Sequence, residues 1–149
     1  MLSPWYITGF CDGEAAFTFS RSNGSFGLYF SIKQREDNRQ IIEDIYQYFN
    51  QVGNLYRGKG APPTKNSGFT KRYIYYRVNK IQELRVIIDH FDKYPLQSKK
   101  KFEAYNLWRE MVLHKIENFR DIDYEKLRSL AEKLSNLNPQ SRAFKVHSK

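Results

Sequence analysis

The sequence predicts an α+β fold of αββαββα order, in which two helix-strand-strand units are followed by a helix and then by C-terminal helices. Apolar residues recur with helical spacing in some segments and alternate with polar residues in others, and Gly, Pro and Asn residues separate these segments. The 149 residues can bury one hydrophobic core. We therefore expect a single domain over residues 1–140 and a flexible tail over residues 141–149.

The first unit begins with a short helix and continues as a hairpin. Ser3 and Pro4 are typical of a helix start, with serine as the N-cap and proline at the first helical position. We expect this helix to end near Gly13. The period then changes to two, and the Asn23-Gly24 turn joins two alternating strands that each carry one apolar and one polar face.

The second unit repeats this pattern, and more helices come after it. Asp37 and Gln40 resemble a capping box, and Pro95 separates the second unit from the C-terminal helices. The expected elements are a helix with its apolar stripe at 41–49, strands at 54–59 and 72–78 around a loop at 60–71, a helix opened by Asn79, and helices at 98–116 and 123–137. One antiparallel sheet with helices on one face leaves the other face open, either as a binding surface or as a merely solvated one.

Charge is concentrated in the middle of the chain. The formal net charge is +9, and residues 51–101 hold 12 Lys or Arg against 3 Asp or Glu, whereas the remainder is balanced at 13 against 13. A localised positive field of this kind favours a polyanionic partner. The basic residues fall on strands and loops and not on one amphipathic helix, which disfavours a membrane surface.

Several other classes of protein lack support. The single cysteine, Cys11, excludes an intrachain disulfide, and there is neither a signal-peptide pattern nor an apolar run long enough to cross a membrane. We expect an intracellular protein, located in an organelle matrix if organelle-encoded and otherwise in the cytoplasm of a prokaryote. The three histidines have no zinc-ligand spacing and no phosphate-binding glycine motif is present, so no small-molecule cofactor is expected.

Residues 7–15 carry the most specific motif. Their sequence, Ile-Thr-Gly-Phe-Cys-Asp-Gly-Glu-Ala, resembles the nine-residue LAGLIDADG motif, with Ala15 where the family usually has Gly. The motif is followed by the expected ββαββα order, so residues 3–117 resemble a single-motif LAGLIDADG homing endonuclease. The resemblance implies a four-stranded sheet shaped like a saddle that binds DNA. It also implies an enzyme that cuts both strands of a long, nearly palindromic DNA target and leaves short 3′ overhangs.

The resemblance also implies roles for individual residues. Glu14 matches the family's metal-binding acid, with the Gly13 carbonyl as a further ligand, whereas Asp12 matches an acid whose role looks structural. Gln34 matches a polar residue that positions a metal-bound water, and Lys100 matches a lysine near the scissile phosphate, although Lys99 and Lys101 leave that choice open. The implied cofactor is Mg²⁺ or Mn²⁺, and Ca²⁺ is expected to bind without supporting cleavage.

A homodimer is expected because the chain holds one acidic motif where a monomeric enzyme of this kind would need two. Gly9 and Gly13 lie on one helical face and permit close helix crossing. The expected interface also includes Phe10 and Asp12.

Double-stranded DNA is the expected partner, with one half-site read by each subunit. The residues expected to contact DNA are Ser20, Ser22, Tyr29, Ser31, Lys33, Asn54, Tyr56, Arg72 and Tyr76 in the groove, and Lys59, Lys65 and Lys71 nearer the phosphates. Two alternatives remain, an intron RNA-splicing maturase and a non-catalytic DNA-binding protein on the same scaffold. The retained acids favour cleavage.

Overall fold

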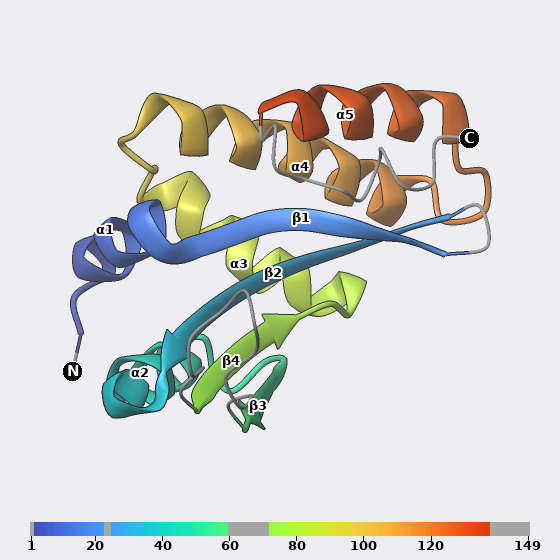
Figure 1. The fold of residues 1–149 in the computed structure, drawn as a ribbon. Coiled ribbons are helices and arrows are strands. Elements are labelled where there is room, and N and C mark those ends of the chain that lie inside the picture. The colour runs from blue at the N-terminus through green and yellow to red at the C-terminus, as the bar shows by residue number, and fades with distance from the viewer. Residues whose placement is uncertain (1, 23–24, 60–71, 138–149) are drawn as a thin grey trace, which may run out of the picture.

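The computed structural model describes residues 2–22, 25–59 and 72–137. The elements are α1 (Pro4–Glu14), β1 (Ala15–Ser22), β2 (Ser25–Arg35), a 3₁₀ turn η1 (Glu36–Asn38), α2 (Arg39–Tyr48), β3 (Asn54–Gly58), β4 (Tyr73–Val78), α3 (Ile81–Lys93), α4 (Lys99–Glu117) and α5 (Tyr124–Leu137). The predicted α+β class and αββαββα order, with further helices after them, are confirmed (Figure 1). The predicted tail at 141–149 lies outside the described residues.

The four strands form one antiparallel sheet in the order β1-β2-β4-β3. Helices α2, α3 and α4 pack against one face of this sheet, and the described residues leave its other face open (Figure 1). The predicted open four-stranded sheet is therefore confirmed. Within the described parts of the chain, no helix combines the length and the apolar character needed to cross a membrane.

Aromatic rings fill the space between the sheet and the helices. Phe17 of β1 lies with its ring centroid 5.2 Å from the rings of Phe91, Tyr105 and Trp108, and the indole of Trp108 donates a hydrogen bond to the Thr18 carbonyl. Burying a large apolar side chain contributes about 1.5–3 kcal/mol, and edge-on ring contacts add to this. These contacts fix β1, which is an edge strand of the sheet, against α3 and α4.

Helix α1 begins and ends as its sequence predicts. The Ser3 hydroxyl accepts a hydrogen bond from the Tyr6 amide at 3.1 Å, and Pro4 occupies the first turn. The inner face carries Ile7 and Cys11, both fully buried, and burial raises the pKa of the Cys11 thiol. Because α1 runs directly into β1 without a loop, the last helical residue lies at one end of the sheet.

Candidate active site and nucleic-acid interface

Asp12 connects α1 to the start of α4. Its carboxylate accepts hydrogen bonds from the backbone amides of Gln97 and Ser98, at 2.8 and 2.9 Å, and from the Ser98 hydroxyl. Partial burial alone would raise the pKa of Asp12, but the hydrogen bonds from Ser98 and Gln97 hold this pKa below its usual value. A negative charge at the positive end of the α4 dipole is also favourable. Asp12 thus makes structural contacts inside the chain, and its part in a dimer interface stays a prediction.

Glu14, the second acid of the motif, is exposed and lies beside Gln34. The Gln34 amide donates to the Glu14 carboxylate at 3.0 Å, so the structure brings together two of the residues singled out in the sequence. Asn38 in turn donates to the Gln34 side-chain oxygen at 3.4 Å. Because this oxygen faces Asn38, the amide nitrogen of Gln34 faces Glu14. Asn38 was not among the residues expected from the sequence, although its position four residues after Gln34 at a helix start was the available signal.

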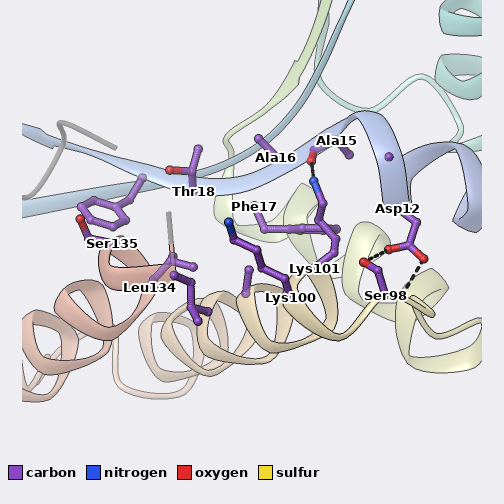
Figure 2. Close-up of a pocket in the computed structure, with 14 residues that line it drawn as sticks. Asp12, Ala15, Ala16, Phe17, Thr18, Ser98, Lys100, Lys101, Leu134 and Ser135 are labelled. Carbon is purple, nitrogen blue, oxygen red and sulfur yellow. Dashed lines mark hydrogen bonds between the residues drawn. The ribbon is translucent and has the colours of Figure 1, made fainter. Parts of the chain in front are cut away.

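The lysines at the start of α4 differ in position. Lys101 donates from its ammonium group to the Ala15 carbonyl, one residue after Glu14, whereas Lys100 points toward β1 on the Thr18 side of Lys101 (Figure 2). Burial lowers the pKa of Lys101, while the nearby charges of Asp12 and Glu14 oppose this shift. Lys101 is therefore the lysine that the structure brings to the end of the motif, and Lys99 and Lys100 are more exposed.

The outer face of α1 is open. Gly9 and Gly13 are exposed, and a Cβ atom added at either position would meet nothing within 4 Å. Around them lie the half-buried Phe10 and the exposed side chains of Trp5 and Tyr6, which are 53% and 52% exposed. The helix thus presents a small-residue strip with aromatic borders, and its use as a dimer interface stays a prediction.

The open face of the sheet is formed by alternate residues of each strand. Strand pairing aligns Ala16, Ser31, Arg77 and Asn54 in one row across it, and Lys33, Tyr75 and Tyr56 in the next. The expected DNA-contacting residues that share this face are Ser20, Tyr29, Ser31, Lys33, Asn54 and Tyr56, with Ser31 only 8% exposed.

The other expected DNA-contacting residues have different positions. Lys59 directly follows β3 and Arg72 directly precedes β4, and both are exposed. Ser22 ends β1, but its side chain lies outside the described structure, as do Lys65 and Lys71 entirely.

The expectation that Tyr76 faces the open side is wrong. Tyr76 is 0% exposed, pairs with Ile32 on the core face, and donates from its hydroxyl to the Val52 carbonyl at 2.7 Å. Because side chains alternate along a strand, the outward residues of β4 are Tyr73, Tyr75 and Arg77. These three were not among the residues expected from the sequence, although the apolar residues at 74 and 78 marked the inward phase.

Two cations on the open face lie over tyrosine rings. The Arg77 guanidinium lies 3.7 Å from the centroid of Tyr29, and the Lys33 ammonium lies 4.0 Å from that of Tyr73. Partial burial and the neighbouring Tyr75 raise the pKa of Tyr29, whereas the charge of Arg77 opposes this shift. Such contacts restrict long side chains before a ligand arrives and leave their N–H donors available.

Comparison with known proteins identifies the family. A family model described as LAGLIDADG endonuclease matches residues 7–112, more than half of the chain. The chain belongs to the LAGLIDADG endonuclease family. The matched range begins at Ile7, the first residue of the motif-like stretch, which covers most of α1 and the first residue of β1.

Fungal proteins are similar to this LAGLIDADG chain. The "Uncharacterized 50.9 kDa protein in ND4 intron 1" of Podospora anserina is 31% identical over 121 residues, which are 75% of this chain and 24% of that protein. The "Probable intron-encoded endonuclease 2" of Neurospora crassa is 26% identical over 145 residues, which are 92% of this chain and 29% of that protein. The chain thus spans less than a third of the length of these relatives.

A solved LAGLIDADG structure shares the fold. The LAGLIDADG meganuclease I-AabMI, solved bound to uncleaved DNA, is 32% identical with a TM-score of 0.72, and the match covers 89% of this chain and 45% of that one. One copy of the fold described here therefore corresponds to about half of that enzyme.

Proposed function

We propose that this chain is half of a site-specific DNA endonuclease, which two copies complete by packing their α1 helices against each other. The observation that carries this proposal is the exposed Glu14 carboxylate, which lies at the end of α1 with Gln34 and Lys101 close to the motif's end. The open strip at Gly9 and Gly13 leaves room for a second α1 to approach. The DNA-bound state of I-AabMI and the name of the Neurospora relative support the same reaction class.

The oxygen ligands that α1 offers fit a hard divalent cation such as Mg²⁺ or Mn²⁺. Among the described residues, no three His, Cys, Asp or Glu side chains gather in a way that could hold a metal. Glu14 and the Gly13 carbonyl would therefore be this chain's ligands, and DNA phosphates, water and the second copy would supply the rest. When bound, the cation would supply Lewis-acid stabilisation of charge on the phosphate. Ca²⁺ is expected to occupy the site without supporting cleavage.

The residues around Glu14 would hold the polar groups of the site in position before DNA binds. Gln34, oriented by Asn38, holds the Glu14 carboxylate by a hydrogen bond that does not depend on DNA. We assign to Lys101, rather than Lys100, the positive charge nearest the scissile phosphate, because Lys101 contacts Ala15 directly after the motif's acid. A fixed cation of this kind stabilises the negative charge that develops during phosphodiester hydrolysis.

The open sheet face would read the major groove of one half-site, since a groove of that width accommodates a β-ribbon. Arg77 and Lys33 are the cations on this face that tyrosine rings hold in place. Two copies related by two-fold symmetry would then require a long, nearly palindromic site. We expect two cuts across the minor groove with short 3′ overhangs. Because relatives are named as intron products, we also propose an intron-encoded protein acting in the organelle or prokaryote whose genome carries the intron.

A cleavage assay on plasmids tests this function. Duplexes that the protein selects from a randomised library would be cloned and incubated with wild type or Glu14→Gln in Mg²⁺, Mn²⁺, Ca²⁺ or EDTA. We expect double-strand cuts by wild type in Mg²⁺ and Mn²⁺ only, and none by the variant. Binding without cleavage in every metal would instead indicate a non-catalytic DNA-binding protein, and preferential binding to intron RNA would indicate a maturase.

A further inference from the structure

A buried chain of hydrogen bonds links α1 to α2 and α3. The Tyr48 hydroxyl lies 2.8 Å from His90 Nδ1, His90 Nε2 lies 2.9 Å from the Thr8 hydroxyl, and that hydroxyl donates to the Tyr94 carbonyl at 2.7 Å. Thr8 and His90 are buried, and Thr8 belongs to the motif itself. We call these four residues the Thr8–His90 relay.

The hydrogen bonds of the relay require a proton on His90 Nε2. The Tyr94 carbonyl can only accept, so the Thr8 hydroxyl donates to it and must accept from His90 Nε2. This excludes the neutral tautomer that carries its proton on Nδ1. In an imidazolium Nδ1 would donate to the Tyr48 hydroxyl, whereas in the neutral ring with its proton on Nε2 it accepts from that hydroxyl.

The surroundings of His90 favour this neutral form. Rings of Tyr48, Phe49, Phe91 and Tyr94 enclose the imidazole at centroid distances of 4.6–5.4 Å. Of the four described residues whose rings contact His90, only the two tyrosines carry an ionisable group. Burial lowers the pKa of His90 to about 4, so at neutral pH the ring is neutral and carries its one proton on Nε2, facing Thr8.

The relay and Asp12 together hold α1 to the segment that joins α3 and α4. Thr8 and Asp12 are four residues apart and thus lie on one face of the helix. Thr8 binds Tyr94 at the end of α3, and Asp12 binds Gln97 and Ser98 at the start of α4. Apolar contacts of Ile7 and Cys11 are not directional, whereas two hydrogen-bonded positions one turn apart fix the rotation of a helix about its own axis.

We propose that Thr8 and His90 are positioning residues, which fix the rotation of α1 and thereby set the directions in which Glu14 and the Gly9–Gly13 strip point. The consequence for cleavage rests on the proposed endonuclease function. The consequence for the helix itself does not, because the relay closes within one chain. Neither residue touches the substrate in this proposal.

Three variants separate positioning from general stability. Thr8→Val keeps the shape of the side chain and removes its hydroxyl, and Thr8→Ser keeps the hydroxyl. Tyr76→Phe removes a comparable hydroxyl bond, which goes to the Val52 carbonyl between α2 and β3 and not to α1. Thr8→Val should slow single-turnover cleavage by about 10-fold to 10²-fold with DNA affinity changed by less than about threefold, as expected for a displaced catalytic group. Thr8→Ser should restore most of the rate, and Tyr76→Phe should lower the unfolding temperature without slowing cleavage.

An NMR measurement tests the relay independently of cleavage. The imidazole nitrogen shifts of His90 in the full chain should report the neutral Nε2–H tautomer. The amide signals of Gly9, Gly13 and Glu14 should shift in Thr8→Val and stay in place in Tyr76→Phe. The Nδ1–H tautomer, unshifted α1 amides in Thr8→Val, or wild-type cleavage by that variant would each overturn the inference. A wild type that never cleaves DNA while these amides shift would overturn the proposed function alone.

Discussion

The end of the motif and the open face of the sheet are built differently. At the motif end polar side chains have fixed partners from other elements, as in the pairs Glu14–Gln34 and Lys101–Ala15. On the open face nearly all side chains are exposed or half-buried, and cations such as Arg77 lie over neighbouring rings. We infer that catalysis depends on a few residues at the motif end, whereas DNA binding depends on many residues spread over the open face. Substitutions should therefore abolish activity at the first region and produce graded, position-specific effects at the second.

The largest effect is expected from Glu14→Gln. A metal ligand contributes several kcal/mol to the transition state, so the cleavage rate should fall by about 10²-fold or more. The side chain is exposed, so the fold and DNA affinity should change little. Rates on a selected plasmid site and affinities on the same duplex would measure both. Full cleavage by this variant would remove Glu14 from the site.

The next effect separates two neighbouring lysines. Lys101→Met should slow cleavage by about 10²-fold, the decrease typical of removing one fixed electrostatic donor. Lys100→Met is the matched control, since Lys100 has the same charge and lies on the same helix but points toward Thr18 of β1, whereas Lys101 reaches Ala15 (Figure 2). Its rate should fall by much less. The opposite order of the two rates would assign the phosphate contact to Lys100.

A third effect concerns the open strip on α1. Gly9→Leu has room in the isolated chain, and leucine favours a helix over glycine by up to about 1 kcal/mol. A monomer should thus keep or gain stability, whereas a dimer that packs through this strip should lose roughly 1–3 kcal/mol or more of association energy. Light scattering across protein concentrations would separate these cases, with Ser129→Leu on the exposed side of α5 as the control. A wild-type monomer on and off DNA would contradict the dimer.

The motif region was accessible from the sequence because its signals are local. Ser3, Pro4 and the nine motif residues lie within fifteen positions, so one short stretch predicts the helix, its cap and the exposed acid. The partners of these residues were not accessible. Ser98 and Lys101 reach α1 across more than eighty residues of chain, and only tertiary packing decides which of three consecutive lysines arrives there.

The open face was harder to predict because the phase of alternation along each strand decides which side chains lie on it. The β4 sequence Tyr-Ile-Tyr-Tyr-Arg-Val places tyrosines on both faces, so composition does not distinguish inward Tyr76 from outward Tyr75. A change of one residue in phase exchanges the two faces of a strand. Arg72 was expected in the groove, but it precedes β4, and the strand pairing places Arg77 and Arg35 on the open face.

The position of Arg77 on the open face leads to a prediction about base recognition. Arg77→Ala should cost about 1–3 kcal/mol at one base position in each half-site, which is the value of one bidentate base contact. Arg72→Ala is the matched control, because it removes the same charge at the end of the strand and should weaken all sites alike. Binding to a panel of single-base variants of the selected site would compare them. An unchanged preference in Arg77→Ala would assign Arg77 to the DNA backbone.

The smallest effect is expected at Lys59, which is exposed just beyond β3 and belongs to the basic middle segment. If it contacts one phosphate in each half-site, Lys59→Ala should reduce the slope of log affinity against log salt by about 0.9 for each phosphate that it no longer neutralises. Selected and scrambled duplexes should lose affinity almost equally, because phosphates carry no base identity. Lys133→Ala on the exposed side of α5 removes the same charge from a helix that does not join the sheet, so its slope should match wild type. Equal slopes for all three proteins would place Lys59 outside the DNA interface and restrict that interface to the rows around Lys33 and Arg77.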